Sequence, residues 1–149
     1  MLDELLKQLI AAHLLPCAGQ ETLFSGAAAP LSFFSSRIDL AHRIGLISPR
    51  LARDLHLIRR IRNDFAHTFD ELTFASAPIA QRVQELAKSN GIAERNPSLD
   101  PAITTTPDGQ FFIAASWIAT FLTAYIEDDV EPFNEARLEW GYTTTTFDE

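Results

Sequence analysis

The sequence contains a single cysteine, Cys17, among its 149 residues, which excludes an internal disulfide. Cys17 follows Pro16 and has no histidine at a fixed short spacing, so we expect an unreactive thiol. His13, His42 and His56 are not accompanied by the cysteines or carboxylates that would make them zinc ligands. The sequence therefore predicts neither a metal nor another cofactor.

Basic residues are also scarce, because 12 lysines and arginines face 20 acidic residues and leave a net charge of −8. Proteins that grip duplex DNA carry a basic face, so we expect no direct binding to duplex DNA. The charge is nevertheless uneven. Seven arginines and two aspartates lie between Arg37 and Arg62, whereas eight acidic residues and one arginine follow from Glu127 onward. We favour pairing between these two regions over the alternative, a basic patch that binds an anionic ligand.

Long apolar runs are missing as well. The longest extends from Phe111 to Ile126 and includes three hydroxyl-bearing residues, whereas a membrane span needs about 20 apolar residues. The first 15 residues form an apolar stripe interrupted by charges, unlike an export signal. We therefore expect a cytoplasmic protein with no membrane contact, and a central buried helix over the apolar run.

Helical signals dominate the rest of the chain. A Gly45 stop, a Ser48-Pro49 start and an Asn90-Gly91 stop separate apolar stripes of helical period. The predicted helices are 2–15, 30–44, 49–67, 76–89 and 110–126, with a further short helix ending at Trp140. Residues 91–108 predict an irregular connection or a short hairpin. The fold class is therefore an all-α, single-domain helical bundle of five or six helices over 1–149, with a core at about 30–90 and an acidic segment at 127–149.

Aromatic residues at helical spacing are typical of a core rather than a ligand pocket. This applies to Phe33, Phe34, Phe111, Phe112, Trp117, Phe121 and Tyr125. Trp140 and Tyr142, beside the acidic end, are better candidates for a contact with a protein partner or with a second copy in a homodimer.

The candidate functional residues lie near the end of the 49–67 helix. With about 100° per residue, Arg62 falls only about 20° from Leu51, inside the predicted buried stripe. A buried guanidinium needs acceptors, and we expect Asp39 on the preceding helix to supply them in preference to Asp64.

Asn63 and His67 are four residues apart, on a neighbouring strip that also carries His56 and Arg60. An arginine, an amide and an imidazole together can bind a phosphate and transfer protons without a metal. The structural alternative is that the arginines form salt bridges, Asn63 is a buried amide, and His67 interacts with the last carbonyls of the helix.

The segment from Pro30 to Phe74 resembles the mannitol operon repressor (MltR-like) family of bacteria. The resemblance rests on SSRIDLA at 35–41, GLIS at 45–48 and IRRIRNDFAH at 58–67. It implies an all-helical transcriptional regulator, a repressor that lacks a DNA-binding module and acts through a protein partner or a ligand.

The hexapeptide RNDFAH at 62–67 is also similar to the R-x4-6-H signature of HEPN domains, which include metal-independent ribonucleases and toxin components. Carried over to this chain, the resemblance makes Arg62 and Asn63 phosphate ligands and His67 an acid or base. The alternative function is therefore an endoribonuclease or toxin-like protein, and RNA is an expected partner only in that case.

Overall fold

The computed structural model describes residues 1–15, 23–26, 28–67, 72–95 and 98–127, and these residues form helices and turns without strands. The helices are α1 (Leu2–Ala12), α2 (Phe34–Arg43), α3 (Pro49–His67), α4 (Ala77–Asn90), α5 (Ile92–Arg95), α6 (Pro101–Thr105) and α7 (Pro107–Glu127). Five of them have ten or more residues and two are short. The predicted all-α helical bundle is confirmed.

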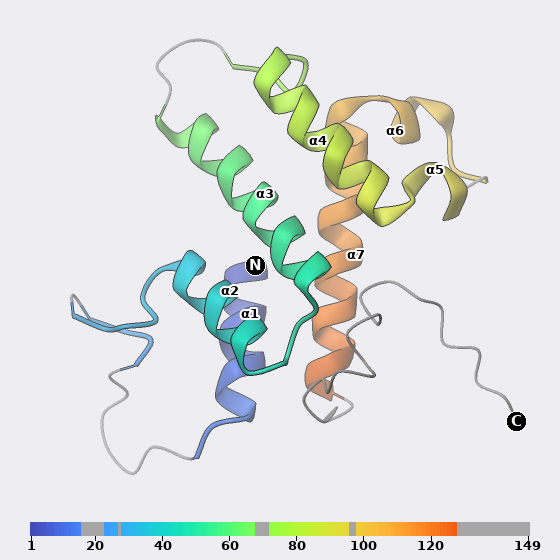
Figure 1. Cartoon of the computed structure of the whole chain (residues 1–149). Coiled ribbons are helices and arrows are strands. Elements are labelled where there is room, and N and C mark those ends of the chain that lie inside the picture. Colours follow the sequence, from blue (N-terminus) through green and yellow to red (C-terminus); the bar gives the residue numbers. More distant parts are fainter. Residues whose placement is uncertain (16–22, 27, 68–71, 96–97, 128–149) are drawn as a thin grey trace, which may run out of the picture.

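The five long helices form a closed ring of contacts. In chain order α1 packs on α2, α2 on α3, α3 on α4 and α4 on α7, and α7 returns to α1 (Figure 1). The short helices α5 and α6 come between α4 and α7 in the sequence, lie beside the beginning of α7 and pack on it. The core fills the inside of this ring.

Most of the core is one apolar cluster. Its fully buried members on α1, α2 and α3 include Leu6, Ile10, Ile38 and Leu55, and α7 contributes Ile118 among others. A second cluster lies at the far end of α3 and α4, where Ile61, Ile79 and Val83 pack beneath partly buried phenylalanines. The rings of Phe65, Phe74 and Phe111 follow one another there, with centroids 4.9 and 5.2 Å apart.

The helix boundaries follow from local chemistry. The Ser48 hydroxyl accepts a hydrogen bond from the Leu51 amide at 3.2 Å, and Pro49 is the first residue of α3. Gly45 and Gly91 follow α2 and α4 with φ of 79° and 60°, a left-handed conformation that favours glycine. All three predicted punctuation sites are confirmed.

α1 begins with two acidic residues, Asp3 and Glu4, at the positive end of its dipole. Hydrogen bonds from the side chains of Gln8 and Lys7 hold the pKa of exposed Glu4 below its usual value, so its carboxylate stays ionised. α1 is shorter than predicted, since it ends at Ala12 rather than at residue 15.

Residues 92–105 depart from the predicted irregular connection or hairpin, because they contain α5 and α6. Pro101 and Pro107, which suggested a break, instead occupy the first positions of α6 and α7. Gly109 allows the two helices to approach closely. A Cβ at this position would collide with the carbonyl oxygen of Ile103 on α6.

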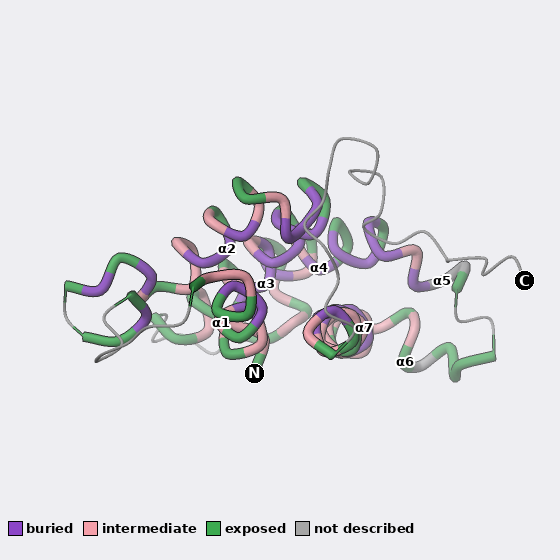
Figure 2. The backbone as a smooth tube through the Cα atoms, turned by 90° about the horizontal axis from the view of Figure 1, so that it is seen from below, coloured by how far each residue is buried: buried purple, intermediate pink, exposed green. Residues whose placement is uncertain are grey.

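The prediction of a central α7 is wrong. Its buried residues are Ile113, Ala114, Ile118, Leu122 and Tyr125, five of 21, and the remainder is partly or fully exposed (Figure 2). By length and composition alone α7 could cross a membrane, while here it packs against α1, α4, α5 and α6.

The aromatic residues were predicted to be core, and two of the seven are not. Phe33 is 72% exposed and Phe112 is 68% exposed, whereas Tyr125 is buried and the other four are partly buried. Phe33 precedes α2 and Phe112 lies on the uncovered side of α7. The predicted helix to Trp140, the acidic segment with Tyr142, and Cys17 lie outside the described residues.

Candidate functional site

The predicted site residues Arg62, Asn63 and His67 are all exposed on the last two turns of α3. The burial predicted for Arg62 is therefore wrong, and so is the alternative of a buried Asn63 amide. Helical periodicity correctly places Arg62 on the side of α3 that faces α2. However, this side of α3 meets only the beginning of α2, with residues 32–35 beside Arg62, so no further turn of α2 covers the guanidinium.

The carboxylates proposed as partners of Arg62 are engaged elsewhere. Asp39 Oδ1 lies 3.1 Å from His56 Nε2, and Asp64 forms an ion pair with Arg82 of α4. Within the described parts of the chain, Arg62 forms no ion pair or hydrogen bond. Its guanidinium is free to meet a ligand.

Arg62 and Asn63 line a cavity of about 270 Å³ between α3 and the start of α2. The remaining lining residues are Asp3 of α1, Arg59 one turn earlier on α3, and Ser32, Phe33, Phe34 and Ser35. His67 is not among them. The structure thus brings together two of the three predicted residues, adds Arg59, and leaves the imidazole outside.

Arg59 is a second arginine of this cavity. It is half-buried, and its Nε is fully buried without a hydrogen-bond acceptor in the described structure. Because Nε is fully buried, any contact of Arg59 with a ligand in the cavity is made by other atoms of its side chain.

The beginning of α2 supplies further donors. Phe33 precedes the helix with an extended backbone, and no side chain caps the first turn. The first intrahelical bond runs from the Arg37 amide to the Phe33 carbonyl at 3.2 Å, so the amides of Phe34, Ser35 and Ser36 have no carbonyl four residues back. The first turn also contains no acidic residue.

Among the described residues that line the cavity, the one acidic group, Asp3, is already paired. Asp3 Oδ1 accepts a 2.8 Å hydrogen bond from Arg37, which is buried. Arg37 Nε also donates to the Leu31 carbonyl at 2.7 Å, and its other terminal nitrogen donates to the Phe24 carbonyl at 3.3 Å. The arginines Arg59 and Arg62 therefore dominate the charge of the cavity.

His56 and Arg60, predicted to share a strip with Asn63 and His67, line a different cavity of about 310 Å³. It lies between α2 and the first half of α3, and its other lining residues include Asp39 and His42. No group of three histidine, cysteine or acidic side chains in the described structure could hold a metal ion.

The sequence reasoning missed a buried polar cluster between α3 and α4. Asp54 is fully buried, accepts the Ser89 hydroxyl at 2.7 Å and the Asn90 amide at 3.3 Å, and Arg50 Nε donates to the same Ser89 oxygen at 3.2 Å. The burial of Asp54 could have been predicted from the sequence, because this residue falls about 300° from Leu51 on the helical wheel, among the apolar residues of the stripe.

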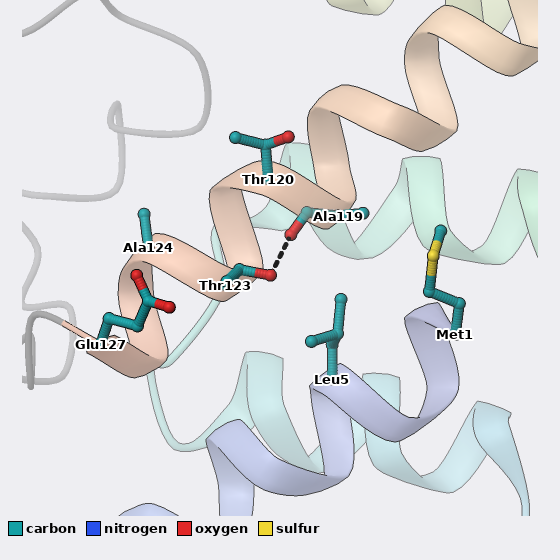
Figure 3. Close-up of a pocket in the computed structure, with 7 residues that line it drawn as sticks. All are labelled: Met1, Leu5, Ala119, Thr120, Thr123, Ala124 and Glu127. Carbon is teal, nitrogen blue, oxygen red and sulfur yellow. Dashed lines mark hydrogen bonds between the residues drawn. The ribbon is translucent and has the colours of Figure 1, made fainter.

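A second cavity, of about 450 Å³ and largely apolar, lies between α1 and the uncovered side of α7 (Figure 3). Met1, which precedes α1, and Leu5 of α1 lie across from Ala119 and Thr123 of α7, while Thr120, Ala124 and Glu127 complete the α7 side. The Thr123 hydroxyl donates to the Ala119 carbonyl at 2.9 Å, which satisfies it within its own helix. We call this cavity the α1–α7 groove.

Comparisons with protein-family models, with curated proteins and with solved structures find no match. The geometry of the chain offers two surfaces, the arginine cavity at the start of α2 and the α1–α7 groove.

Proposed function

We propose that this protein is a cytoplasmic transcriptional regulator of the MltR type, a repressor without its own DNA-binding module that acts through a protein partner or a ligand. The observation that carries the proposal is the α1–α7 groove. α7 is strongly apolar, yet within the described residues its face with Ala119, Thr120 and Ala124 is partly or fully exposed beside Met1 and Leu5.

Small side chains along this face support docking of a partner. Alanine and threonine leave the α7 backbone accessible, so a helix or loop of a partner can approach closely and cover the apolar surface. The burial of α3 also argues against direct readout of DNA. α3 contacts α2 and α4 and buries seven residues between them, so it does not project as a recognition helix does.

The test uses Ala124→Arg, which places a charge in the groove on an exposed residue, and Gln84→Arg as a matched control at an exposed position of α4. Tagged full-length protein is recovered from its native cells and bound proteins are identified. We expect a transcription-related partner that Gln84→Arg retains and Ala124→Arg loses. Deletion of the gene should raise the transcript level of a target operon, and only Gln84→Arg should restore repression.

Two results would overturn the proposal. One is the absence of any transcription-related partner together with unchanged transcripts after deletion. The other is recovery of the protein with membranes, or as a homodimer whose dissociation by Ala124→Arg leaves transcription unaffected. In either case the groove serves another purpose.

A second candidate is a HEPN-type endoribonuclease that uses Arg62, Asn63 and His67. The exposure of all three residues on α3 favours it, since they are accessible to RNA or to a second copy of the chain. Against it, Arg62 and His67 are five positions apart and project about 140° from each other, so one chain does not converge them on one phosphate.

A further inference from the structure

The arginine cavity gathers several hydrogen-bond donors, and within the described residues Arg62 has no ion-pair or hydrogen-bond partner. Arg59 and Arg62 contribute two guanidinium groups, Asn63 contributes an amide, and the Asp3 carboxylate is held by Arg37. A cavity with these properties is built for an anion.

The start of α2 adds to this character. Its first-turn amides are uncapped beside Ser32 and Ser35, whose hydroxyls can donate as well. Helix N-termini carry a positive partial charge and free N–H groups, and both favour oxyanions. The two guanidiniums and this helix end thus belong to one cavity and reinforce each other.

The size and rim of the cavity restrict the ligand. About 270 Å³ exceeds the roughly 30 Å³ share of one water several times, so a tetrahedral oxyanion fits with some atoms to spare. Phe33 at the cavity is 72% exposed and offers an apolar surface to the remainder of a ligand. The dimensions suit a small molecule better than a polymer.

We propose that this cavity binds the terminal phosphate group of a small molecule. Arg62 and Arg59 bind the phosphate oxygens through their guanidiniums, and Asn63 and the amides at the start of α2 complete the set of donors. The imidazole of His67 lies outside the cavity, so the phosphate is bound rather than cleaved. The inference rests on the proposed function for the role of this molecule, which is that of the regulatory ligand.

Binding is measured by calorimetry on the purified full-length chain with three probes: inorganic phosphate, phenyl phosphate as a monoester, and dimethyl phosphate as a diester. We expect the dianionic phosphate and monoester to bind and the diester to bind at least tenfold more weakly, because it carries one charge and fewer free oxygens. Phenyl phosphate should bind more tightly than inorganic phosphate if Phe33 contacts the ring.

Three variants locate the site. Arg62→Ala should weaken phenyl phosphate binding at least tenfold, and Arg62→Lys should restore part of the loss, since lysine keeps the charge without the planar fork. Arg60→Ala removes an equal charge from the same helix outside the cavity and should change affinity less than twofold. Because Arg62 is exposed, its replacement should leave the melting temperature unchanged. Arg59→Ala is a second variant within the cavity, and it should also weaken phenyl phosphate binding.

The proposal is overturned if neither inorganic phosphate nor phenyl phosphate binds at concentrations up to about 10 mM. Equal losses for Arg60→Ala and Arg62→Ala would also overturn it, since they indicate nonspecific attraction. Preference for a short single-stranded RNA over the monoester would replace it with RNA binding. Phosphate binding without any transcript change after gene deletion would leave the site standing and reject the regulator, whereas the reverse pair of results would reject only the site.

Discussion

The hydroxyl of Ser89 donates a 2.7 Å hydrogen bond to the carboxylate of Asp54, and both residues are buried. This bond joins α4 to α3 at a fully buried carboxylate, whose other oxygen lies 3.6 Å from a guanidinium nitrogen of Arg53. Asn90, the last residue of α4, donates at 3.3 Å to the same oxygen as Ser89, so the end of α4 supplies two donors to this carboxylate. A buried carboxylate of this kind is strongly dependent on its donors.

Ser89→Ala should lower the free energy of unfolding by about 1–3 kcal/mol, because it removes one donor from a buried carboxylate. Urea unfolding followed by circular dichroism measures the loss. Ser98→Ala, at an exposed position, is the matched control and should change stability by less than about 0.5 kcal/mol. Equal stability of the two variants would contradict the importance of the Asp54 cluster.

Arg37→Ala should be more severe, at about 3 kcal/mol, because it removes the donors to Asp3, to the Leu31 carbonyl and to the Phe24 carbonyl at once. The replacement also detaches the residues before α2 from α1. Arg43→Ala removes the same side chain from an exposed position of α2 and serves as the control. If the two midpoints of denaturation coincide, Arg37 has no anchoring role.

Gly109→Ala tests the close approach of α6 and α7. In an exposed helix this change usually stabilises by up to about 1 kcal/mol, whereas here the new Cβ meets the Ile103 carbonyl and should destabilise by about 1–3 kcal/mol. The sign of the change in melting temperature therefore shows whether α6 and α7 approach closely at Gly109. A rise would mean that α6 does not lie against α7 at this position.

Purified protein should leave labelled RNA intact in the presence of EDTA, because His67 and Arg62 do not converge within one chain. His67→Ala should then behave as the wild type does. Gel analysis over a range of enzyme concentrations is sufficient. RNA cleavage that disappears in His67→Ala and in Arg62→Ala, with both variants folded, would instead establish the nuclease and imply that a second copy completes the site.

Local signals predicted the long helices well. Ser48 with Pro49, Gly45 and Gly91 act through the backbone of their immediate neighbours, so their effect does not depend on the rest of the fold. The α5 and α6 region was harder, because two helices of four and five residues depend on packing against α7 rather than on their own propensity.

The sequence predicted which side of each helix faces the bundle, but not how far each residue on that side is buried. Arg62 and Asp54 both fall on the apolar side of α3, yet Asp54 is fully buried under α4 while Arg62 lies beside the beginning of α2 and stays exposed. A helical wheel contains no information on how far the neighbouring helix extends. For the same reason the composition of α7 indicated burial all round, although its neighbours cover only part of it.

The cavity at the start of α2 could be predicted only in part. Arg62 and Asn63 were identified from their types and spacing, whereas Arg59 and the uncapped turn at Phe34 were not. Arg59 and this turn line the same cavity because α2 and α3 pack antiparallel, which places residues 32–35 beside the end of α3. Such proximity is a property of the assembled bundle.

The ring of helices has a consequence for how the chain acquires its structure during synthesis. α1 is made first, but the helix that closes the ring against it, α7, is made last of those described. Until α7 has left the ribosome, one flank of Leu6, Leu9 and Ile10 has no native partner. Ring closure is thus a long-range event that comes late, and nascent α1 is the segment most in need of shielding by chaperones.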